Sequence, residues 1–104
     1  MANRWRGEVA LVIDGERHVA RLTLGALAEL EETLGEDTLL ALVERFEGGA
    51  FSTRDVLALL KAGLRGGGSD LSEGALLNAE IEGGPMAAAR AAAELLARAF
   101  VVPE

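Results

Sequence analysis

The chain has 104 residues, half of them apolar, and its 17 acidic and 10 basic side chains give a net charge of -7. A chain of this length holds one hydrophobic core, so we expect a single domain over residues 1–104. The negative charge repels polyphosphate and anionic lipid, which argues against nucleic acid and membranes as partners. Because the chain has no cysteine, disulfides and thiolate metal sites are excluded.

The sequence carries no recognisable signal for export or for membrane insertion. The basic residues near the N-terminus are not followed by the apolar segment of a signal peptide. No stretch approaches the roughly 18 uncharged apolar residues that a transmembrane helix needs. We therefore expect a cytoplasmic protein.

Residues 8–22 predict a β-hairpin. Apolar and polar residues alternate on both sides of Asp14-Gly15, a pair typical of two-residue hairpin turns. Pairing outward from this turn gathers one set of apolar side chains on the same face: Val9, Leu11, Ile13, Ala20 and Leu22. Because two strands alone are marginal in water, the helices that follow must cover this face.

Four to five short helices follow the hairpin, and their ends are marked by capping residues and by glycine stops. Thr23 and Ser72 are expected helix caps, and Ser52 with Asp55 resembles a capping box. The predicted ranges are about 24–34, 37–47, 53–65, 72–82 and 85–100.

The apolar residues of these helices recur at helical spacing and define the expected core. The predicted stripes include Leu24 in the first helix, Leu40 in the second and Met86 in the last. The fold class is therefore α+β, with an N-terminal β-hairpin followed by four to five short α-helices packed on its apolar face.

The glycine run in "AGLRGGGSD", residues 62–70, has two interpretations. Consecutive backbone donors at a helix start can bind a phosphate. This run instead follows a helix and contains no lysine, unlike a phosphate-binding loop. A helix C-cap followed by a turn is therefore the favoured interpretation.

No residue pattern predicts catalysis, a cofactor site or a metal site. His18 has no second histidine for a metal and no nearby Cys or Ser for a nucleophilic pair, so a packed or solvated side chain is favoured. A solvated or partner-binding helix face is favoured over acid–base catalysis for the carboxylates of Glu29, Glu31, Glu32, Glu36 and Asp37. We expect a protein that is not an enzyme.

Two apolar features are candidates for partner binding. Trp5 lies between two arginines, and Trp and Arg dominate interface hot spots, although a lone Trp more often covers the edge of a small core. The C-terminal residues Phe100, Val101 and Val102 are apolar beyond the expected end of the last helix. They fit docking on a partner as well as docking on the chain's own hairpin.

The chain resembles the small tail-assembly proteins encoded in gene transfer agent clusters and related tailed-phage genomes. The resemblance covers essentially the whole chain. The matching stretches are "NRWRGEV", "IDGERHVARLTLGALAELEETLG", "KAGLRGGG" and "AAAELLARAF".

This resemblance implies a tail assembly chaperone, which keeps the long helical tape measure protein soluble while the tail tube polymerises and is absent from the finished particle. Members of the family are also labelled tail tube protein, which implies a structural tail component. Tube subunits close large β-sheets into a ring, whereas this sequence predicts one short hairpin. A third hypothesis is a small ligand-binding domain or enzyme, which would need a pocket with convergent polar groups.

Under the chaperone hypothesis, we expect an apolar groove between the hairpin and the helices to bind an amphipathic helix of the tape measure protein. Trp5 and Phe100 are the expected anchors. Basic residues of the partner would face Glu29, Glu32 and Glu36. The second strand, residues 17–21, must be either covered or free, and a free edge could add a strand from another copy, so we also expect weak homo-oligomer formation.

Overall fold

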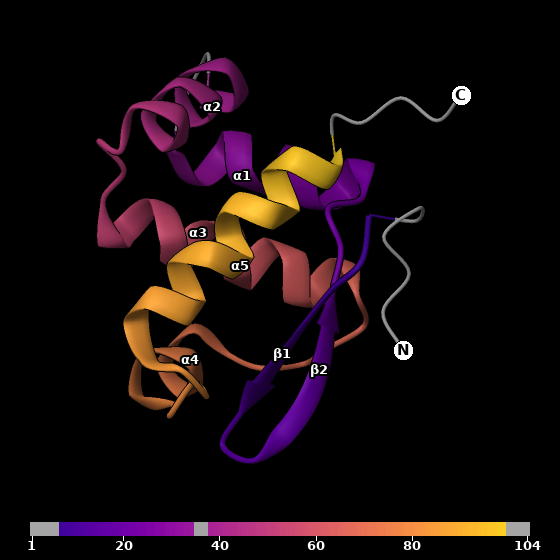
Figure 1. The fold of residues 1–104 in the computed structure, drawn as a ribbon. Helices are drawn as coiled ribbons and strands as arrows, with labels where there is room; N and C mark the ends of the chain where they lie inside the picture. The colour runs from indigo at the N-terminus through magenta and orange to yellow at the C-terminus, as the bar shows by residue number, and fades with distance from the viewer. Residues whose placement is uncertain (1–6, 35–37, 100–104) are drawn as a thin grey trace.

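In a computed structural model, which describes residues 7–34 and 38–99, the chain is an α+β fold as the sequence predicts (Figure 1). A two-stranded antiparallel hairpin precedes five helices. The elements are β1 (Val9–Ile13), β2 (Glu16–Ala20), α1 (Leu24–Leu34), α2 (Thr38–Gly48), α3 (Thr53–Gly66), α4 (Glu73–Asn78) and α5 (Gly84–Ala99). In Figure 1, α1 and α2 lie on one side of α3 and α4 lies on the other. None of the helices in these ranges is long and apolar enough to cross a membrane.

The hairpin has the predicted turn and register. Asp14 and Gly15 both have positive φ, at 51° and 82°, as the two central residues of a type I′ turn require. The strands pair from Ile13 with Glu16 to Val9 with Ala20. The expected apolar face is buried at Val9, Leu11, Ile13 and Ala20, while Leu22 is half-buried. Helices α3 and α5 cover this face.

The glycine run ends α3 as predicted and also fits the helix against β2. The Gly67 N–H donates to the carbonyl of Gly63, and the Arg21 N–H donates to the same carbonyl oxygen at 2.8 Å. A Cβ on Gly67 would lie 1.8 Å from the Val19 oxygen, and a Cβ on Gly66 would lie 2.0 Å from the Arg21 oxygen. Glycine is therefore required here for close approach to a strand, which the sequence did not reveal.

The predicted helix starts are confirmed. The Thr23 Oγ1 accepts a hydrogen bond from the Ala26 N–H at 3.1 Å, and the Ser72 Oγ accepts one from the Ala75 N–H at 3.1 Å. Ser52 and Asp55 form both hydrogen bonds of a capping box.

The predicted core stripes are wrong at three positions. Leu24, Leu40 and Met86 are 86%, 69% and 72% exposed. Small residues take part in the packing instead, including Ala26 of α1 and Ala92 of α5. Because these helices carry apolar residues around much of their circumference, spacing alone does not fix the buried face, and alanine allows closer contact.

The predicted helix over 72–82 ends early, at Asn78. The following residues 79–83, which we call the strap, run beside the outer edge of β1, where Ile81 forms an isolated bridge with Ile13. The Asp14 N–H donates to the Glu80 carbonyl at 2.8 Å, and the Glu82 N–H donates to the Val12 carbonyl at 3.0 Å. The outward backbone groups of β1 thereby gain partners that a longer α4 would not provide.

Candidate functional site

An apolar groove of about 610 Å³ lies between α3, α4 and α5. It is larger than the two other cavities considered below. Helix α3 contributes Val56, Leu57 and Leu60 to its lining. The other apolar side chains in its walls are Phe51, Leu76, Leu77, Ala79, Ile81, Pro85, Met86, Ala88 and Ala89. We call this surface the α3–α5 groove.

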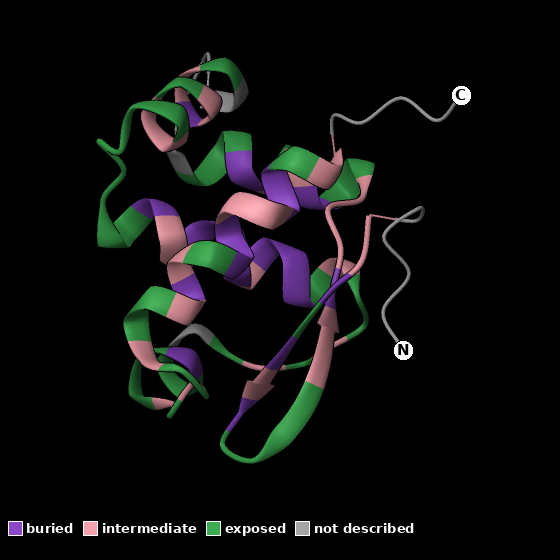
Figure 2. Ribbon diagram, in the orientation of Figure 1, coloured by how far each residue is buried: buried purple, intermediate pink, exposed green. Residues whose placement is uncertain are grey.

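Large apolar side chains at this groove are open to solvent. Leu77 is 62% exposed, Met86 is 72% exposed and Phe51 is 37% exposed. Figure 2 shows exposed residues along α4 and in the first turns of α5. A group of exposed apolar residues beside an apolar groove is typical of a protein-binding surface.

The strap forms one wall of the groove through Ala79, Glu80 and Ile81. Its backbone is fixed to the hairpin by the hydrogen bonds described above and by the Glu80 N–H, which donates to the Asp14 Oδ1 at 2.8 Å. Glu80 is the one charged residue among those that line the groove in the described part of the chain. The hairpin thus shapes a groove that lies mostly among helices.

An ion pair joins α2 to the first turn of α3. The Arg45 guanidinium on α2 donates two hydrogen bonds of 2.8 Å to the carboxylate of Asp55, which is 4% exposed. Burial raises the pKa of Asp55, but hydrogen bonds from Arg45 and Ser52 and the Arg45 charge outweigh it and leave the pKa below its ordinary value. The ring of Phe46 on α2 stacks on the ring of Phe51, with centroids 4.6 Å apart. This stacking joins Phe51, which lines the groove, to α2.

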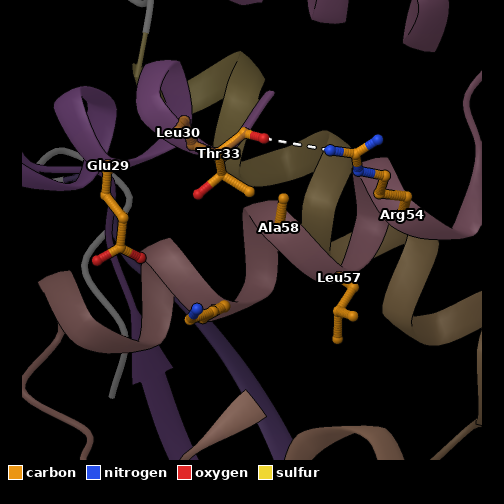
Figure 3. Close-up of a pocket in the computed structure, with 7 residues that line it drawn as sticks. Glu29, Leu30, Thr33, Arg54, Leu57 and Ala58 are labelled. Carbon is orange, nitrogen blue, oxygen red and sulfur yellow. Dashed lines mark hydrogen bonds between the residues drawn. The ribbon is translucent and has the colours of Figure 1, made fainter. Parts of the chain in front are cut away.

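A cavity between α1 and α3 is much smaller, at about 70 Å³ (Figure 3). It is lined by Glu29, and across it the Arg54 guanidinium donates to the Thr33 carbonyl at 3.2 Å. Ligand pockets are typically about 300 to 1,000 Å³, so this space is a packing gap rather than a binding site.

A second apolar cavity, of about 280 Å³, lies between α2 and α5. Its lining includes Val43 and Phe46 from α2 and Leu96 from α5. These three side chains are half-buried or buried. The cavity therefore exposes less large apolar surface than the α3–α5 groove.

Two of the predicted acidic binding residues, Glu29 and Glu32, do not line the α3–α5 groove. Glu29 was expected to face water, but its side chain is 23% exposed and pairs with Arg65 of α3. Glu32 is exposed on α1 and lines none of the three cavities. Neither carboxylate therefore belongs to the lining of the groove.

The remaining predicted binding residues, Trp5, Glu36, Phe100, Val101 and Val102, lie outside the described residues, so their roles stay predictions. The sequence analysis did not identify Phe51, Leu77 and Glu80 as candidate binding residues, although all three line the groove. One available signal was the pair Leu76-Leu77, because adjacent side chains leave a helix in different directions and a short helix need not bury both. Leu76 is buried and Leu77 is exposed.

His18 has a neighbouring serine, contrary to the sequence-based expectation. Ser69, in the loop after α3, is 51 positions from His18 in the sequence, and its Oγ lies 3.4 Å from the His18 Nδ1. The Ser69 Oγ also accepts from the Leu71 N–H at 3.3 Å, and His18 lines none of the three cavities. The contact is long and serves to join the loop to the hairpin. Among the residues of 7–34 and 38–99, no group of three or more His, Asp or Glu side chains could hold a metal ion.

Comparison with known proteins gives one family. A family model described as "Phage tail tube protein, GTA-gp10" matches residues 6–101. No curated protein and no solved structure gave a significant match. The match covers the hairpin and all five helices. The chain therefore belongs to the phage tail tube protein family GTA-gp10, a family of phage and gene transfer agent tails.

Proposed function

We propose that this tail-family protein binds an amphipathic helix of another tail protein in the α3–α5 groove. The observation that carries the proposal is the combination of an apolar groove with the exposed side chains of Leu77 and Met86. An amphipathic helix that lays its apolar face in such a groove is a common mode of protein recognition. Thr53 and Glu80 are the polar side chains among the described lining residues, which supports a protein ligand over a small polar molecule.

One form of this function is a structural component of the tail. The family description supports this form more directly than it supports a chaperone. In this form, the groove would receive a helix of a neighbouring tail protein and the protein would remain in the finished particle.

The other form is the tail assembly chaperone predicted from the sequence, with the tape measure protein as its client. The hairpin supports this form, because the outer edge of β1 bonds to the chain's own strap and Arg21, directly after β2, bonds to α3, whereas a tube subunit needs sheet edges that join its neighbours. Trp5 and Phe100 remain proposed additional anchors.

Coexpression with the tape measure protein and the major tube protein of the same gene cluster tests the proposal. We expect one of them to copurify with the wild type. Leu77→Glu combined with Met86→Glu should weaken the complex by about 2 kcal/mol or more, roughly 30-fold in affinity. Leu24→Glu combined with Leu40→Glu is the matched control, since these leucines are also largely exposed and line none of the three cavities.

The two forms differ in what purified particles contain. Quantitative mass spectrometry should find the protein in stoichiometric amounts if it is structural and absent if it is a chaperone. Equal copurification of the groove variant and the control variant would rule out the groove as the binding surface.

A further inference from the structure

Asp14 links the hairpin turn to the wall of the α3–α5 groove. Its backbone adopts the positive φ of the turn, its N–H donates to the Glu80 carbonyl, and its Oδ1 accepts from the Glu80 N–H. Both backbone groups of Glu80 are therefore held by one residue. This fixes the Glu80 backbone at the groove wall and limits where its side chain can reach.

Glu80 is unusual among the residues that line the groove. It carries a charge beside walls that are otherwise apolar apart from Thr53. Its side chain is exposed, and within the described part of the chain its carboxylate makes no ion pair. A helix seated in the groove would cover part of this carboxylate, and reduced contact with water strengthens its attraction to a positive charge.

We propose, resting on the function proposed above, that the partner is an amphipathic helix with a lysine or arginine at the edge of its apolar face, and that Glu80 selects this residue. Charge complementarity supports this occupant, because Glu80 is the one charged residue among the described residues that line the groove, and the chain has a net charge of -7. A helix with a glutamate at the same place would leave two like charges facing each other, which is how charged residues reject wrong partners. Asp14 acts as a positioning residue.

Two synthetic peptides test this inference on the full-length chain. Each is an amphipathic helix of leucine and alanine on one face and glutamine on the other, and the two differ by one lysine or glutamate at the edge of the apolar face. At low ionic strength, we expect the wild type to bind the lysine peptide about fivefold more tightly. NMR shift perturbation should place the peptide beside Leu77 and Met86.

Variants separate the role of Glu80 from that of net charge. Glu80→Lys should reverse the preference between the peptides. Glu31→Lys makes the same change in charge at an exposed position that lines none of the three cavities, and it should keep the wild-type preference.

The role of Asp14 is tested by two further variants. Asp14→Gly permits the positive φ but removes the side-chain acceptor, so it should reduce the preference to about twofold or less while the hairpin still forms. Asp14→Asn keeps both the acceptor and a tolerance for positive φ, and should restore the preference.

The inference is overturned if the wild type binds both peptides equally, if it binds neither, or if Glu31→Lys acts like Glu80→Lys. It is also overturned if light scattering shows a dimer that Leu77→Glu dissociates, since a second copy would then fill the groove. If the peptide preference holds but no tail protein copurifies, only the function proposed above fails. If a tail protein binds through the groove with no charge preference, only this inference fails.

Discussion

At the scale of single residues, the ion pair of Arg45 and Asp55 makes stability depend on pH. The pKa of Asp55 is lowered in the folded protein. The pair therefore stabilises the fold fully above the unfolded pKa of aspartate, about 3.9, and this contribution is lost as the pH falls through the lower folded pKa. At neutral pH, Asp55→Asn should lower the free energy of unfolding by about 1 to 3 kcal/mol.

Urea denaturation at pH 7 and at about pH 3 checks this prediction. The difference between wild type and Asp55→Asn should shrink at the acidic pH, where the wild-type carboxylate is also being protonated. An equal difference at both pH values would mean that the pair does not contribute through its charge.

Gly67 is the residue whose small size the fold most directly requires. A Cβ there would meet the backbone oxygen of Val19 at 1.8 Å, and backbone cannot yield as a flexible side chain does. Gly67→Ala should therefore cost about 1 to 3 kcal/mol in a thermal or urea unfolding experiment. Gly74→Ala is the control, because nothing lies within 4 Å of its Cβ position, and it should leave stability unchanged or slightly higher. Equal effects of the two substitutions would contradict the close contact between α3 and β2.

At the scale of elements, the strap is the structure that the sequence did not predict. Local signals identified the hairpin register and the caps at Thr23, Ser52 and Ser72, because those contacts join residues close in the sequence. The strap after α4 is instead held by hydrogen bonds between Asp14 and Glu80, 66 positions away. The groove was not predicted for a similar reason, because its walls come from three separate helices. The spacing of apolar residues did not determine which face of each helix is buried.

Hydrogen exchange tests the strap directly. The amides of Asp14 and Glu82 donate to the strap and to β1, respectively, so both should exchange more slowly than the amide of Gly15 at the tip of the turn. In Asp14→Gly, protection at Glu82 should fall while the paired amides of the hairpin stay protected. Full protection of Glu82 in that variant would show that the Asp14 side chain does not hold the strap.

At the scale of the whole molecule, the structure changes the basis for expecting self-association. The sequence left open whether the edge of residues 17–21 is covered or free. In the structure, the Arg21 N–H bonds to Gly63, and the backbone oxygens of Val19 and Arg21 lie close to Gly67 and Gly66. Weak homo-oligomer formation remains a proposal. Light scattering over a concentration series should show any such association unchanged by Leu77→Glu, because the groove is proposed to hold another tail protein. Association that Leu77→Glu weakens would instead show that a second copy occupies the groove.

The central claim is that the α3–α5 groove holds a helix of another tail protein. Site-specific photocrosslinking in cells that assemble the particle tests it most directly, with the crosslinker at position 77 and a control crosslinker at position 24, which is more exposed. We expect position 77 to crosslink to the tape measure protein or to a tube protein, identified by mass spectrometry, and position 24 to give no such product. Crosslinks to these proteins from position 24 and none from position 77 would contradict the claim.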